Sequence, residues 1–275
     1  MLSFLRGRKK NIIQIVIFCL FFLSYSVTSK AVEKIENDTV DLTDFGKNGF
    51  SFVVKRYIYL ESDIKGISIS LKNNNNSAYL INSSILFNDD DKNVPIVNKD
   101  RERTPFMILP PLYRLEPSSE YSWNIRRISE GSNDMALPKD RESLFWIAFR
   151  AVPLKDSKIE EKKSVSLTIT PTFFFKLIYR PESIMALENK DVIDDVIDDV
   201  IVEKVNENIV INNKSPLYMT FEYLKVGEVE IKNDGRAITV KPFSTVSVEA
   251  PKNVQGKLSW RFNDENFFII KDKEY

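Results

Sequence analysis

Short runs in which apolar and polar residues alternate recur along this chain, and they limit the folds open to it more than any other feature. Side chains two residues apart share one face of a strand, so this alternation is typical of strands with one buried face. No long run with the period of a helix competes with it. The alternating apolar positions are Ile67, Ile69 and Leu71; Val165, Leu167 and Ile169; Val229 and Ile231; Ile238 and Val240; and Val246 and Val248.

Clusters of residues that favour turns separate these runs. They are rich in asparagine, glycine, proline, serine and acidic residues, and such clusters end strands. Many short strands at this spacing predict an all-β protein built of sandwiches, rather than a parallel sheet covered by helices. The clusters lie at residues 73–76, 88–93, 117–119, 130–133 and 233–235.

The composition of the chain changes after residue 181. The segment 188–208 is acidic and contains the unit Val-Ile-Asp-Asp twice in succession. We therefore expect two domains, residues 32–182 and 183–275, with the boundary near Glu182, and each has a size that suits one sandwich.

The aspartate pairs of the repeated unit allow two interpretations. They could be calcium ligands, but the glycine-turn loop of such sites is missing. A solvated loop, or an edge strand whose acidic residues discourage aggregation, explains them better. We expect no bound metal.

The first thirty residues have the order of a secretory signal. Four basic residues precede an apolar run, residues 12–23, and small residues follow it. The run is shorter than the roughly 20 residues of a spanning helix, although an uncleaved anchor stays open. We expect a signal peptide over residues 1–31, cleaved near Ser29 or Ala31, and no membrane span afterwards.

Residue types that carry much of enzyme chemistry are missing. The chain has no histidine, and its one cysteine, Cys19, would leave with the signal. This excludes most nucleophile–base pairs, imidazole zinc sites, cysteine-ligated clusters and disulfides. Lys+Arg and Asp+Glu both number 39, but five of the cations belong to residues 1–31, and the resulting excess of acid lies after residue 182.

Other ligand and substrate classes also find little support. Nothing in the spacing of Glu116, Glu120 and Glu142 singles out an acid and a base for a hydrolase. The sequence contains no glycine-rich phosphate loop, so we expect neither ATP nor another cofactor. The basic pairs Lys55-Arg56 and Arg126-Arg127 lack interleaved aromatic residues, so we expect no nucleic-acid partner.

Four stretches occur in an order that identifies a family. They are Leu137-Pro138-Lys139-Asp140-Arg141-Glu142-Ser143-Leu144-Phe145-Trp146 with Val152-Pro153; Lys55-Arg56-Tyr57-Ile58-Tyr59; Pro110-Pro111 with Arg114-Leu115-Glu116-Pro117; and Lys176-Leu177-Ile178-Tyr179-Arg180-Pro181. Together they resemble the signature of periplasmic pilus-assembly chaperones, the PapD-like family. The resemblance spans residues 52–181 and continues more thinly at 213–218, 242–244 and 258–264.

The resemblance implies a fold and a function. Members consist of two immunoglobulin-like sandwiches set at an angle, bind pilus subunits in the cleft and deliver them to an outer-membrane usher. They lend an edge strand to a subunit that lacks one. Here that strand is expected from about Val165 to Phe175, with Val165, Leu167 and Ile169 entering the subunit's groove. Pro171 departs from the family's pattern, and because proline cannot donate to the ladder, donation is expected to stop or bend there.

The resemblance also implies roles for charged residues. Arg56 and Lys176 match two cations that anchor the C-terminal carboxylate of the subunit, which would set the register of the donated strand. Glu142, Arg180 and Asp264 match an ion network between the domains. Ala148 stands where the family commonly has asparagine. Residues 32–50 exceed the family's short N-terminal segment and are expected to form an extra arm, which either packs on the chain or pairs with a partner.

Two alternatives remain at this stage. A secreted structural or adhesive sandwich protein, such as a pilin, would also have a signal peptide and alternating strands, but it leaves Arg56 and Lys176 unexplained. For a chaperone, self-association of the free protein through its exposed strand is also open.

Overall fold

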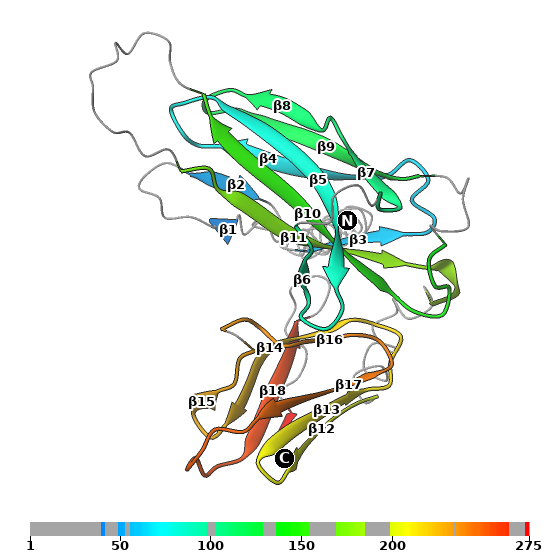
Figure 1. Cartoon of the computed structure of the whole chain (residues 1–275), viewed down its shortest axis with the longest axis vertical. Coiled ribbons are helices and arrows are strands. Elements are labelled where there is room, and N and C mark those ends of the chain that lie inside the picture. Colours follow the sequence, from blue (N-terminus) through cyan, green and yellow to red (C-terminus); the bar gives the residue numbers. More distant parts are fainter. Residues whose placement is uncertain are drawn as a thin grey trace, which may run out of the picture. The chain divides into compact units, whose positions relative to one another are not determined.

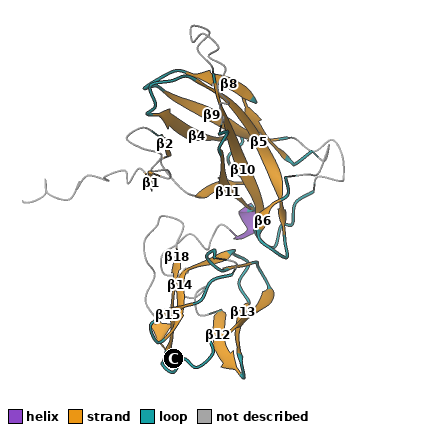
Figure 2. Ribbon diagram, turned by 60° about the vertical axis from the view of Figure 1, so that its left-hand side comes forward, coloured by secondary structure: helices purple, strands orange, loops and turns teal. Residues whose placement is uncertain are grey.

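The computed structural model describes residues 40–41, 49–52, 56–97, 103–128, 136–154, 169–184, 199–233, 235–263 and 273–274. The regular secondary structure of the described residues is almost entirely β, which confirms the expected all-β class (Figures 1 and 2). Its one helical element is the short turn at residues 182–184. In these residues no helix is long and apolar enough to cross a bilayer. The predicted signal peptide and the repeated Val-Ile-Asp-Asp unit, apart from Asp199, fall outside them.

The first sandwich consists of two sheets that both contain strands from distant parts of the sequence. One sheet has the order β1-β2-β4-β9-β7, and the other has the order β3-β11-β10-β5-β6, with β8 also paired to β5. The strands are β1 (Val40–Asp41), β2 (Phe50–Phe52), β3 (Arg56–Leu60), β4 (Ile67–Asn73), β5 (Tyr79–Asp89), β6 (Val94–Pro95), β7 (Phe106–Leu109), β8 (Leu112–Leu115), β9 (Glu120–Arg127), β10 (Ser143–Pro153) and β11 (Thr172–Arg180).

The core of this sandwich follows the alternation in the sequence. Ile69 and Leu71 of β4 are fully buried, as are alternate residues of β10 and β11. Aromatic rings fill much of the space between the sheets, and Trp123 and Phe149 meet edge to face at 4.9 Å. Because aromatic side chains bury large areas, they supply much of the hydrophobic stabilisation that a chain without disulfides requires.

Part of the expected N-terminal arm packs against the first sandwich. Within residues 32–50, Val40–Asp41 forms β1 and pairs with β2, and Phe50 is buried in the core. The described portion of the arm therefore extends an edge of the sheet.

The second sandwich is smaller and has its own core. Its sheets have the orders β12-β13-β17 and β15-β14-β18-β19, with β16 also paired to β14. The core contains Ile184, Ile211, Phe221 and Trp260 among others. Both sandwiches belong to one compact unit, Thr39–Tyr275. The strands are β12 (Val200–Val205), β13 (Asn208–Asn213), β14 (Met219–Val226), β15 (Val229–Glu230), β16 (Thr239–Val240), β17 (Ser244–Glu249), β18 (Leu258–Asn263) and β19 (Lys273–Glu274).

Candidate functional site

Among the described residues, strand β11 has no pairing partner on one side over its first half, Thr172–Phe175, and we call this stretch its free edge. It pairs with β10 from Thr172 to Tyr179, but on its other side the parallel strand β3 pairs only from Lys176 onward. Between Thr172 and Phe175, no strand among the described residues pairs with that second edge. Unpaired N–H and C=O groups on a strand edge are a template for a further strand.

The free edge ends at a row of four side chains. Leu86, Trp146, Lys176 and Arg56 occupy the same register position on β5, β10, β11 and β3. Residues of β11 with odd numbers, such as Phe173 and Phe175, are buried in the core, so Lys176 lies on the opposite face. The indole N–H of Trp146 donates to Asn88 Oδ1 at 2.9 Å. The row therefore places two cations side by side where β3 begins.

Lys176 contacts two hydroxyl groups of the second sandwich. Its Nζ donates to Thr239 Oγ1 at 2.7 Å and to Thr220 Oγ1 at 3.1 Å. Burial and, to a smaller extent, the positive charge of Arg56 together lower the pKa of Lys176 to about 7. The ammonium thus sits where its charge is poorly solvated, and an incoming anion would relieve this.

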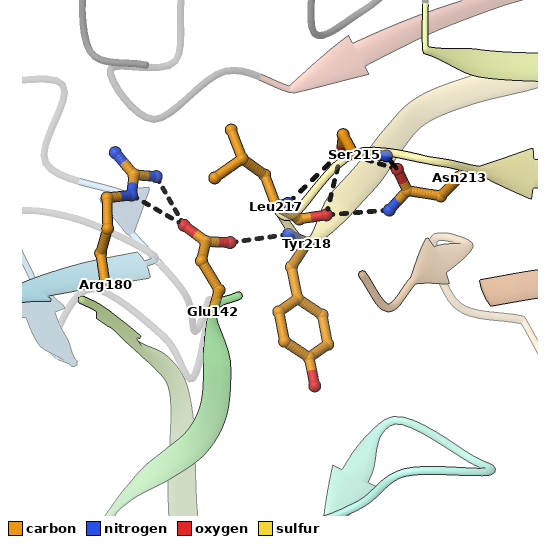
Figure 3. Close-up of polar contacts among 6 residues, drawn as sticks. All are labelled: Glu142, Arg180, Asn213, Ser215, Leu217 and Tyr218. Carbon is orange, nitrogen blue, oxygen red and sulfur yellow. Dashed lines mark hydrogen bonds and ion pairs between the residues drawn. The ribbon is translucent and has the colours of Figure 1, made fainter. Parts of the chain in front are cut away.

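Glu142 and Arg180 form a fully buried ion pair (Figure 3). Glu142 Oε1 accepts hydrogen bonds from Arg180 Nε at 3.0 Å and Nη2 at 2.5 Å, and each side chain is about 1% exposed. The second oxygen, Oε2, accepts the backbone N–H of Tyr218 at 2.6 Å. Burial raises the pKa of the Glu142 carboxyl, and the charge of Arg180 and the Tyr218 N–H oppose that rise. The carboxylate therefore joins β11 to the segment that precedes β14.

An apolar cluster lies beside the ion pair. Leu144, Ile178 and Tyr218 are buried together, and Ile58 packs against them. Leu144, Ile178 and Ile58 come from β10, β11 and β3, and Tyr218 immediately precedes β14, so the strands that carry the charged residues also supply an apolar contact to the second sandwich.

Asn213 fixes the loop that presents Tyr218. Its buried amide donates to the carbonyl of Leu217 at 2.8 Å, and its Oδ1 accepts the N–H of Ser215 (Figure 3). The same amide also donates to the carbonyl of Lys241 at 3.0 Å. Asn73 makes the corresponding bonds in the first sandwich, to Ser77 and to the N–H of Asn75. Each sandwich therefore closes the same kind of turn with one buried asparagine.

Replacing Asn213 by alanine is expected to lower the free energy of unfolding by about 2 kcal/mol, because several buried backbone groups lose their partner. Chemical denaturation measures the change. Asn212→Ala, at a partly exposed neighbour on the same strand, is the matched control. Equal losses for the two variants would contradict the role given to Asn213.

The structure brings together four of the residues expected from the sequence. Arg56 and Lys176 are register partners, and Glu142 and Arg180 form the buried pair. Ile169 is 62% exposed. Val165, Leu167 and Asp264 lie outside the described residues.

Of the strand expected from about Val165 to Phe175, residues 165–168 lie outside the described residues, and the described strand β11 begins at Thr172. Ile169–Pro171 are described and are not in a strand, although the Pro171 carbonyl still accepts the N–H of Ala151. Proline has no N–H to donate, which accounts for a strand that starts just after it.

Three contributors were not predicted from the sequence. Thr220 and Thr239 bind the Lys176 ammonium. In the sequence, the only indication of this role is that each is a polar residue next to apolar residues of a strand. Tyr218 acts through its backbone N–H, so no residue type reveals it.

Comparison with known proteins places both parts of the chain. Residues 52–185 match the family model of the pili and flagellar-assembly chaperone PapD N-terminal domain, and residues 195–265 match that of the pili assembly chaperone PapD C-terminal domain. Chaperone protein AggD of Escherichia coli is 29% identical in an alignment of 216 residues, and the match covers 75% of this chain and 76% of AggD. Chaperone protein MyfB of Yersinia enterocolitica is 26% identical in an alignment of 230 residues, and the match covers 79% of this chain and 77% of MyfB.

A solved structure is also similar. It is that of the Salmonella enterica SafA pilin in complex with the SafB chaperone, with a TM-score of 0.65 and 25% identity, and the match covers 82% of this chain and 95% of the matched one.

Proposed function

We propose that this chain, which belongs to the PapD family of pili-assembly chaperones, captures pilus subunits by adding the segment from about Val165 to Phe175, which includes the free edge of β11, to their sheets. The SafB chaperone was solved with a pilin bound, which supports a subunit as the partner here. A secreted structural or adhesive protein does not explain why both PapD domain models match.

The geometry of β11 supports strand addition. A subunit that lacks one strand exposes an apolar groove and unpaired backbone groups, and an added strand satisfies both, a recognition mode of which chaperone–pilin complexes are a known example. Here the free edge of β11 stops where parallel β3 begins. If a subunit strand also runs parallel to β11 along this edge, its C-terminus would lie next to Lys176 and Arg56.

The adjacent cations carry the proposal. A C-terminal carboxylate is an anion that every subunit has, so two cations at a fixed position can orient many subunits without reading their sequence. Lys176 and Arg56 lie side by side at the end of the free edge. We therefore assign them to the carboxylate anchor, and we assign Val165, Leu167 and Ile169 to the subunit's groove.

The decisive experiment is co-expression in a periplasm. A pilus subunit should persist when it is produced with this chain and be degraded when it is produced alone, and the two should purify together. A subunit that is degraded equally in both cases would overturn the proposal.

An acidic side chain at Ile169 should abolish subunit capture, because burying an unpaired carboxylate in an apolar groove is costly. Ile169 is 62% exposed, so Ile169→Asp should leave the chain's own stability unchanged. Val205→Asp, at an exposed apolar residue of the second sandwich, is the control for added charge. Co-purification of the subunit measures both, and retention of the subunit by Ile169→Asp would contradict the donor role.

Carboxylate binding should weaken as the pH rises through about 7. The pKa of Lys176 in the free protein is about 7, so above this pH the side chain loses its proton and its attraction for an anion. Arg56 stays charged, so binding falls without disappearing. Affinity for a peptide with a free C-terminus, measured between pH 6 and pH 9, should decline for the unaltered chain and stay flat for Lys176→Arg.

Several further assignments follow from family membership. We propose that residues 1–31 direct export to the periplasm and are removed, and that the domains meet near Glu182. We place Asp264 in the ion network of Glu142 and Arg180, and the outer-membrane usher as the acceptor of the subunit. Detection of a complex of chaperone, subunit and usher would test the last assignment. No enzymatic activity is proposed.

A further inference from the structure

The side chain of Lys176 has two partners outside its own sandwich. Its ammonium can donate three hydrogen bonds, and two of them go to the hydroxyls of Thr239 and Thr220. Both threonines are 8% exposed. Two of the three donors are thus held in fixed directions, and the third is left for another acceptor.

The two threonines are themselves held in place. They are partners in the ladder between β14 and β16, and their Oγ1 atoms lie 3.2 Å apart. The amide of Asn93, from the turn between β5 and β6, donates to the Thr239 carbonyl at 2.9 Å. The two hydroxyl groups are therefore held in position by the surrounding structure to accept hydrogen bonds from Lys176.

We infer that Thr220 and Thr239 are positioning residues of the carboxylate anchor, which hold the Lys176 ammonium protonated and aimed at the subunit's C-terminus. This rests on the proposed function, and it makes the second sandwich a part of the anchor. Among the described charged groups, Arg56 on β3 is the one whose field acts on Lys176. On β10 its register partner is Trp146, and on β14 and β16 its ammonium contacts Thr220 and Thr239, none of which titrates near neutral pH.

The experiment replaces the hydroxyls without changing side-chain size. In Thr239→Val and in the double variant with Thr220→Val, the ammonium loses acceptors, so the pKa of Lys176 should fall by about one unit or more. Affinity near pH 7.5 for a short alternating peptide with a free carboxylate should fall about tenfold. Affinity for the same peptide with an amidated C-terminus should not change. Thr239→Ser should restore the unaltered behaviour, and Thr245→Val, an exposed threonine on β17, is the control.

Two readouts separate this inference from the proposed function. NMR titration of the Lys176 side chain needs no ligand, and an unchanged midpoint in the double variant would overturn the inference. If the unaltered chain does not prefer the free carboxylate to the amide, the carboxylate anchor itself fails, whatever the titration shows. If the double variant does not fold, Thr239→Val against Thr239→Ser gives the same comparison.

Discussion

Replacing Glu142 by alanine is expected to lower the free energy of unfolding by about 3–5 kcal/mol, more than any other single change considered. The substitution leaves the Arg180 guanidinium buried without its carboxylate and removes the acceptor of the Tyr218 N–H. Urea unfolding followed by tryptophan fluorescence measures the loss, because Trp123 reports on the first core and Trp260 on the second.

An exposed ion pair provides the matched control. Arg114 and Glu116 also approach within 2.6 Å, but their side chains are 62% and 55% exposed. Glu116→Ala should therefore cost at most about 1 kcal/mol. A double variant with leucine at positions 142 and 180 should recover much of the loss, because it removes both buried charges together. Equal effects of Glu142→Ala and Glu116→Ala would show that the buried pair does not join the sandwiches.

Replacing Lys176 by methionine is expected to weaken subunit binding strongly while leaving the chain's own stability unchanged or slightly higher. The pKa of Lys176 is lowered because burial disfavours its charge, so an apolar side chain of similar length removes an unfavourable term. Hydrogen bonds to charged groups contribute about 1.5–3 kcal/mol, so loss of the anchor should weaken subunit binding by roughly 10–100-fold. Affinity for a purified subunit and the unfolding midpoint should be measured on the same preparations.

Because Lys176→Met should weaken subunit binding without lowering the chain's stability, the two measurements together test the prediction. If Lys176 had only a structural role, its replacement would lower subunit binding and stability together. Arg56→Gln should also weaken binding, and Lys72→Met, at an exposed lysine on β4, should change neither quantity. Normal capture of the subunit by Lys176→Met would exclude the carboxylate anchor.

Alternation in the sequence predicted the strands well where one face meets a core. Ile69, Leu71, Ile238 and Val240 are buried as their period of two requires. Val229 is 41% exposed, because β15 is a two-residue strand at the edge of its sheet and covers little. The pattern marks which residues share a face, and the tertiary fold decides how deeply that face is buried.

The candidate site was only partly accessible to sequence reasoning. Arg56 and Lys176 are distant along the chain, and their proximity depends on the parallel pairing of β3 with β11. Resemblance to a family supplied this pair, since no local spacing could. Thr220 and Thr239 depend on the contact between the sandwiches, and Tyr218 contributes a backbone group, which every residue except proline carries.

In the proposed mode of capture, β3 would act as a fixed stop for a subunit strand added to β11. Because β3 occupies the edge from Lys176 onward, a subunit strand that runs the same way has to end at that row. Each subunit side chain is then assigned to a face by counting back from the last residue. One residue inserted before the terminus would turn the whole strand over. If capture works in this way, subunits of unrelated sequence could share this chaperone, provided that they keep the same spacing between their groove and their C-terminus.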